Sequence, residues 1–203
     1  MAGPTTEFWQ ERFENQQTGW DRGASNPQLL AWLDSAALQP CRIAVPGCGG
    51  GWEVAELARR GFDVTGLDYT PAAVAKTRAL LEDQGLKAQV VQADVLRYQP
   101  ETAFDAIYEQ TCLCAIHPDD WQEYASQLHQ WLRPGASLWA LFMQVLRPAA
   151  SEDGLIQGPP YHCDINAMRA LFAEPRWTWP KPPYARVPHP MHVHELALRL
   201  TRG

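Results

Sequence analysis

With 203 residues, of which 46% are hydrophobic and 20% charged, the chain has the length of one ordinary domain and is too apolar for a disordered protein. Its formal net charge of -6 argues against a DNA or RNA partner, and no apolar run approaches the roughly 18–20 residues of a transmembrane helix. The five cysteines follow no zinc spacing, and residues 1–14 lack the apolar region of a secretion signal. We therefore expect a reduced, cytoplasmic protein without a membrane or nucleic-acid partner.

Two helices are predicted before the first strand. Residues 7–15 and 27–38 carry apolar side chains at helical spacing, and Asn26 lies where a helix N-cap is expected. Trp9, on the first of these helices, and Trp20, in the polar loop between them, could cover a ligand cleft. Plain packing of Trp9 against the sheet is an equally good interpretation.

A strand, a glycine-rich turn and a helix come next. Residues 43–45 form a short apolar run, residues 47–51 include four glycines, and a helical pattern over 52–60 ends at Gly61. Glycines let the backbone adopt positive φ and approach a ligand closely. This order of elements places a ligand at the carboxyl end of the first strand of an open α/β sheet.

The next predicted strand, residues 62–68, ends in a carboxylate. Asp68 lies 17 residues after Gly51, at the tip of this strand, where an acid can bond the hydroxyls of a ribose. The alternative is that Asp68 caps the following helix, residues 71–84. Because Thr70 and Pro71 already supply a cap and a first helical residue, we favour the nucleoside-binding interpretation.

Polar residues follow the third and fourth predicted strands, residues 87–92 and 104–108. Asp94 can accept from an adenine amino group while Val95 packs on the ring, although Asp94 could also be an ordinary turn residue. The fourth strand runs into Glu109, Gln110 and Thr111 at the same edge of the sheet, where side chains would face the reacting group.

The later elements are predicted less sharply. They are a helix over 118–132, a strand over 137–145, a loop over 146–160, a short helix capped by Asp164, an irregular strand within 177–190, and an alternating strand over 192–200. A loop of that length is usually a functional lid or disordered. His189, His192 and His194 have no further ligand at a recognisable spacing, so we expect no metal.

Four motifs in order resemble one group of enzymes. Residues 47–51 with Asp68 resemble the S-adenosylmethionine site of class I methyltransferases. Three further stretches resemble the thiopurine S-methyltransferase-like and halide/thiol methyltransferase branch, namely the lid motifs within residues 8–30, the stretch 108–116 after the fourth strand, and the loop 158–161. The resemblance covers roughly residues 7–172.

The resemblance implies a Rossmann-like, doubly wound α/β sheet of seven mostly parallel strands with an antiparallel C-terminal strand. It implies a single domain over 1–203, with a helical lid over 1–38 and an α/β core over 41–203, acting as a monomer. S-adenosyl-L-methionine would be bound by Trp9, Trp20, Gly47, Cys48, Gly49, Asp68, Tyr69, Asp94, Val95 and Glu109. The acceptor would be bound by Gln110, Thr111 and Tyr161.

The function that follows is methyl transfer to a small soft nucleophile, with a thiol as the preferred acceptor. Glu109 is the candidate catalytic residue because it could receive a thiol proton, although a purely cofactor-binding role is the preferred interpretation. Alternatives are a halide or chalcogen-oxyanion methyltransferase and a non-catalytic nucleoside-binding protein of the same fold. An NAD-type oxidoreductase would instead have six parallel strands and no alternating final strand.

Overall fold

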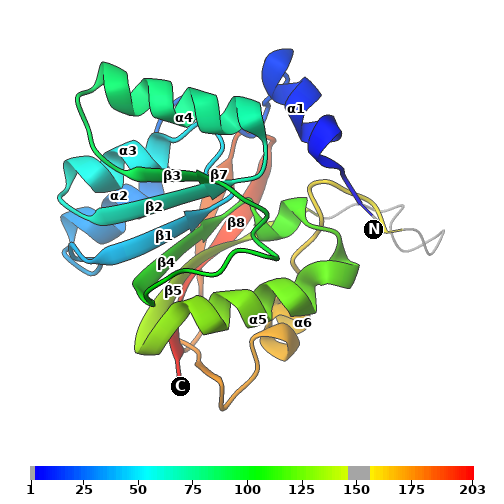
Figure 1. The fold of residues 1–203 in the computed structure, drawn as a ribbon. Coiled ribbons are helices and arrows are strands. Elements are labelled where there is room, and N and C mark those ends of the chain that lie inside the picture. Colours follow the sequence, from blue (N-terminus) through cyan, green and yellow to red (C-terminus); the bar gives the residue numbers. More distant parts are fainter. Residues whose placement is uncertain (1–2, 146–155) are drawn as a thin grey trace.

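An open sheet runs through the part of the chain that the computed structural model describes, residues 3–145 and 156–203 (Figure 1). Within these residues it has eight strands, β1 (Arg42–Pro46), β2 (Asp63–Asp68), β3 (Gln89–Gln92), β4 (Phe104–Gln110), β5 (Leu132–Gln144), β6 (Trp177–Thr178), β7 (Ala185–His189) and β8 (Val193–Arg202). Their order is β3-β2-β1-β4-β5-β8-β6, and β7 also pairs with β8. The first five strands are parallel, and β8 is antiparallel to β5, β6 and β7.

Helices cover both faces of the sheet. They are α1 (Thr6–Glu14), α2 (Pro27–Asp34), α3 (Trp52–Arg59), α4 (Pro71–Asp83), α5 (Trp121–Trp131) and α6 (Ile165–Leu171), with two 3-10 turns, η1 (Leu113–Ala115) and η2 (Pro118–Asp120). Side chains alternate between faces along a strand, so Ile43 and Val45 of β1 pack with α2, α3 and α4, whereas Ala44 packs with α5 and α6. Figure 1 shows these two groups of helices on opposite sides of the strands.

Local sequence signals set several helix boundaries as predicted. The Asn26 side chain accepts from the Gln28 backbone N–H at 2.8 Å and caps α2. Asp164 accepts from the N–H groups of Asn166 and Ala167 at the start of α6. Gly61 follows α3 with a φ of +86°, the left-handed conformation that ends many helices.

Two predicted boundaries are wrong, and one predicted strand is divided. Helix α2 stops at Asp34 rather than at residue 38, because Ser35 is its C-cap and Ala36 adopts a φ of +56°. Strand β5 begins at Leu132, within the segment predicted as helix and turn, because Leu132 pairs with Phe104 beyond a register shift in β4. The irregular strand predicted within 177–190 is present as two short strands, β6 and β7, which both pair with β8.

The strand order places the working edge of the sheet. Strands β1, β2 and β3 proceed in one direction from the centre and β4 and β5 in the other, so the order reverses between β1 and β4. Ligands of open α/β sheets bind outside the carboxyl ends of the strands at such a point. No helix among the described residues is long and apolar enough to span a membrane.

Candidate active site

A cleft of about 820 Å³ lies at the carboxyl ends of the parallel strands. Its walls come from segments far apart in the sequence, namely residues 3–20, the turn after β1, residues 68–70, residues 93–96, residues 111–120, Met143, Pro159–Pro160 and Met191. This volume is in the range of small-molecule sites in proteins.

The glycine turn forms one wall of the cleft. Gly47 and Gly49 have φ values of +61° and +52°, which other residues rarely adopt. A Cβ added to Gly47 would lie 2.9 Å from the Cβ of Cys112, so this turn packs directly on the segment after β4. The sequence thereby keeps side chains out of the place where the two segments meet.

Asp68, at the end of β2, lines the cleft and also braces its wall. One carboxylate oxygen accepts from the Gly49 N–H at 3.1 Å and the other from the Thr70 N–H at 2.9 Å. The Thr70 side chain makes no capping bond of its own, and Asp68 bonds the N–H of this N-cap residue rather than an N–H of α4 itself. Burial raises the pKa of Asp68, and the two amide donors oppose that rise.

The other cleft residues predicted to bind the cofactor surround the same space. Tyr69, Asp94 and Val95 line it, and the Asp94 carboxylate accepts from the Leu96 N–H at 2.9 Å. Trp9 and Trp20 also line it and meet edge to face, with ring centroids 5.3 Å apart.

Thr111 lines the cleft in a strained conformation. Its φ is +60°, uncommon for any residue other than glycine and an outlier for a β-branched one. Its hydroxyl donates to the Gln110 carbonyl at 2.7 Å. Strain of this kind persists only where the surroundings impose it.

Glu109 supplies part of that restraint and is not among the residues that line the cleft. Its carboxylate is 1% exposed and accepts from the Leu113 N–H at 2.7 Å. Burial raises its pKa to about 7, against the opposing effect of the Leu113 and Cys112 amides. The geometry therefore gives Glu109 backbone partners in the turn after β4 and places it behind the lining of the cleft.

Three more residues predicted for the site lie behind the cleft wall. Cys48 and Gln110 line a smaller adjoining pocket of about 60 Å³, and the Cys48 sulfur lies 3.8 Å from the Thr77 hydroxyl. Tyr161 is 5% exposed, and its ring meets that of His117 edge to face at 5.4 Å. The neighbouring Pro159 and Pro160 line the cleft in its place.

Sequence reasoning missed several cleft residues. Phe13 lies four residues after Trp9 on the same face of α1, a spacing that could have indicated it. His117, Met143 and Met191 also line the cleft, but they are brought there from distant segments and carry no local signal.

The histidines near the C-terminus do not form a metal site. Among residues 3–145 and 156–203, no group of three or more His, Cys, Asp or Glu side chains could hold a metal ion. His189 is 5% exposed, and its Nδ1 accepts from the Met191 N–H at 3.3 Å. Residues 146–155, in the loop predicted from the sequence, lie outside the described residues.

The fold and the cleft together define a class I methyltransferase. A parallel sheet that reverses at β1 and β4 and ends in an antiparallel strand carries a glycine turn and an acid at the tip of β2. The side-chain-free turn and the Asp68 carboxylate fit S-adenosylmethionine.

Comparisons with known proteins agree. The family model described as thiopurine S-methyltransferase matches residues 4–181. The chain is 32% identical over 167 residues to thiocyanate methyltransferase 1 of Arabidopsis thaliana, covering 81% of this chain and 70% of that protein.

Two solved structures have the same fold. One, from work on the conversion of a disulfide bond into a thioacetal group during echinomycin biosynthesis, has a TM-score of 0.79 and 26% identity over 97% of this chain and 92% of that one. The other, a Burkholderia thailandensis 1,6-didemethyltoxoflavin-N1-methyltransferase with bound S-adenosylhomocysteine, has a TM-score of 0.75 and 19% identity over 97% and 86%. The chain belongs to the thiopurine S-methyltransferase family and is an S-adenosylmethionine-dependent methyltransferase.

Proposed function

We propose that this enzyme methylates the sulfur of a small, neutral, apolar thiol. The observation that carries the proposal is the character of the cleft wall. Among residues 3–145 and 156–203, four carboxylates line it, those of Glu7, Asp68, Asp94 and Asp120, against one guanidinium, that of Arg12. The rest of the wall is largely apolar.

The nucleoside end of the cofactor fits between the ends of β2 and β3. We assign the ribose hydroxyls to Asp68 and the adenine to Asp94 and Val95, with Tyr69 beside them and Gly47 and Gly49 under the methionine portion. Trp9 and Trp20 would cover it. When bound, S-adenosylmethionine supplies an electrophilic methyl group, and the protein's contribution is to align the acceptor with that group and exclude water.

The acceptor end is assigned to the remaining part of the cleft. Its lining is soft and apolar, with Ile116, Met143, Pro159, Pro160 and Met191. Thr111 and His117 are the polar exceptions that could orient a sulfur atom. Tyr161 would support this end through its contact with His117 rather than touch the acceptor. Gln110 lies one step behind Thr111.

The charges of the wall favour a neutral acceptor over an inorganic anion. An acidic wall attracts the positively charged sulfonium and repels a small anion that has to enter the same space. The Arg12 guanidinium does not fully offset the repulsion of an anion by these carboxylates. Its positive charge is already engaged by Phe8, since it lies 3.4 Å from the centroid of the Phe8 ring and donates to the Phe8 carbonyl. We assign Glu109 to holding the turn after β4, so the proton of an incoming thiol would pass to solvent water as its sulfur takes the methyl group.

A second candidate is methylation of thiocyanate, halide or chalcogen oxyanions. It is favoured by the 32% identity to a protein named thiocyanate methyltransferase 1. The two candidates differ in the charge of the acceptor, so they can be separated directly.

The test compares acceptors with a labelled methyl donor. We expect kcat/KM for phenylmethanethiol, an alkyl thiol that stays protonated at pH 7, to exceed that for thiocyanate and iodide at least tenfold. Asp120→Asn removes one carboxylate from the wall and should narrow that preference several-fold. Glu123→Gln is the matched control, since Glu123 lies on the first turn of α5, pairs with Arg97 and does not line the cleft. Equal or better use of thiocyanate by the unaltered enzyme would overturn the thiol assignment.

We further propose that the enzyme works in the cytoplasm as a monomer without nucleic acid, as one domain. Of the predicted lid, residues 1–38, we assign the part before α2 as the cover, because α2 packs in the core. Support comes from the five free cysteines, which suit a reducing compartment, and from the net charge of -6.

A further inference from the structure

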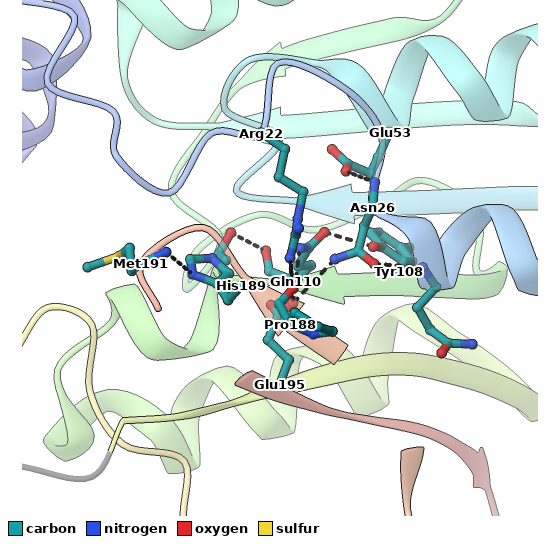
Figure 2. A network of polar contacts seen from close by, with 11 residues as sticks. Arg22, Asn26, Glu53, Tyr108, Gln110, Pro188, His189, Met191 and Glu195 are labelled. Carbon is teal, nitrogen blue, oxygen red and sulfur yellow. Dashed lines mark hydrogen bonds and ion pairs between the residues drawn. The ribbon is translucent and has the colours of Figure 1, made fainter. Parts of the chain in front are cut away.

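A buried polar network lies behind the cleft and centres on Glu195 of β8. This side chain is 0% exposed. Its Oε2 accepts from Asn26 Nδ2 at 3.2 Å and from Gln110 Nε2 at 3.4 Å, and it lies 3.8 Å from Arg22 Nη2. Figure 2 shows these side chains converging on the Glu195 carboxylate.

The partners of Glu195 are themselves tied to other segments. Arg22 also donates to the Pro188 carbonyl in the β7–β8 hairpin. The Asn26 N–H donates to Glu53 of α3 at 2.9 Å. The Tyr108 hydroxyl donates to Gln110 Oε1 at 2.7 Å. The network thus joins the loop between α1 and α2, the end of β4 and the last hairpin.

Each of these three segments also supplies a wall of the cleft. Trp20 lies two residues before Arg22, Thr111 directly follows Gln110, and Met191 lies in the hairpin that follows Pro188. Arg22, Gln110 and Glu195 do not themselves line the cleft. The network can therefore set the walls relative to one another without touching the ligand.

Stability alone explains this arrangement poorly. Glu195 Oε1, Arg22 Nε and His189 Nε2 are buried without a hydrogen-bond partner among the described residues. Burial raises the pKa of Glu195 to about 8, with Arg22 as the largest opposing influence. Replacing a buried ion pair by well-packed apolar residues is often neutral or stabilising, so such a pair is weak evidence for a stabilising role.

We propose that Glu195 and Arg22 are positioning residues for methyl transfer, whose buried contact fixes Trp20, over the donor, relative to Thr111 and Met191 at the acceptor end and so closes the cleft around the methyl donor. The proposal rests on the assignment of the cleft to that donor. The role of Glu195 and Arg22 differs from that of Glu109, which holds the turn after β4 through the backbone alone.

The experiment compares Glu195→Gln, Arg22→Gln and the double variant with the unaltered chain. The control is Arg199→Gln on the same strand, because Arg199 bonds Ser137 at 3.0 Å and stacks on Trp139 away from the cleft. Calorimetry gives the Kd of S-adenosylhomocysteine and scanning calorimetry gives Tm. Hydrogen exchange of the ligand-free chain follows residues 18–26, 109–112 and 187–193.

Both single variants should weaken S-adenosylhomocysteine binding at least tenfold, and the double variant should weaken it no further than either single variant. The control Arg199→Gln should weaken binding less than twofold and have a similar Tm. Arg22→Lys, which keeps the charge, should recover part of the loss. The three segments should exchange faster together, a result that needs no ligand.

A Kd within twofold of that of the unaltered chain in both single variants, or losses that add in the double variant, would overturn the proposal. If Glu195→Gln does not fold, Arg22→Gln decides, since Arg22 is in a loop and its side chain is 19% exposed. Failure of the unaltered chain to bind S-adenosylhomocysteine would instead refute the donor assignment.

Discussion

The carboxylate of Asp68 combines two tasks within one side chain, since it faces the cleft and bonds the amides of Gly49 and Thr70. We predict that Asp68→Ala weakens binding of S-adenosylhomocysteine at least tenfold. Loss of a hydrogen bond to a charged group costs about 1.5–3 kcal/mol, and the glycine turn also loses its brace. Calorimetry measures the effect.

Asp63→Ala is the control for that experiment, because Asp63 lies at the opposite end of the same strand with a side chain that is 76% exposed. It should leave the Kd unchanged. An unchanged Kd in Asp68→Ala as well would remove Asp68 from the donor site.

The raised pKa of Glu109 predicts how the free energy of unfolding depends on pH. Burial raises its pKa from the ordinary 4.5 to about 7, so the folded chain holds the proton more tightly than the unfolded chain. Its contribution to the free energy of unfolding is therefore greatest below about pH 4.5 and is lost as the pH rises to about 7.

Glu109→Gln lacks this titration. Relative to the unaltered chain, the variant should gain on the order of 1–3 kcal/mol of unfolding free energy between pH 4.5 and pH 7. Urea unfolding of both chains at several pH values measures the difference. A difference that does not change with pH would mean that Glu109 is ionised throughout, as its amide donors alone would favour.

For single residues, the sequence predicted those cleft residues that can be recognised from their position at the end of a strand. Asp68, Asp94 and the glycine turn follow strands, and all reach the cleft. The sequence could not show which way the side chains after β4 turn. The left-handed conformation of Thr111 and the buried amides that bond Glu109 are consequences of packing rather than of residue type.

At the scale of elements, the sequence predicted the bounds of a helix or strand best where a capping residue or a glycine marks its end. Helix α3, with Gly51 before it and Gly61 after it, and helix α6, capped by Asp164, agree with the predicted bounds to within about a residue. Strand β5 was predicted five residues short, because Arg133, Pro134 and Gly135 are a turn signal that pairing with β4 overrides. The short strands β6 and β7 exist only because β8 offers them partners, which no local pattern records.

The whole molecule separates into a folded core and a cover. Both core clusters are built from the sheet, helices α2 to α6 and the segments that join them, and α1 contributes no buried residue to either. Helix α1 is held over α4 by contacts such as the bond from the Ala72 N–H to Gln10 at 3.0 Å. Its aromatic side chains, Phe8, Trp9 and Phe13, instead line the cleft. The first segment of the chain therefore lines the cleft and adds no buried side chain to the core.

We predict that deleting residues 1–19 leaves the sheet folded but abolishes methyl transfer. The deletion removes α1 with Trp9 and Phe13, so the cleft loses its cover and water reaches the reacting atoms. Circular dichroism checks the fold, and transfer of a labelled methyl group to phenylmethanethiol checks activity.

In the full chain, hydrogen exchange over residues 5–20 should slow when S-adenosylhomocysteine is added. A matched truncation at the other end, removal of Gly203, leaves the cleft intact and should change neither activity nor exchange over 5–20. Full activity after the N-terminal deletion, or exchange over 5–20 that ignores the ligand, would show that α1 only packs against α4, and the donor would then have to be enclosed by residues 93–117 and Met191.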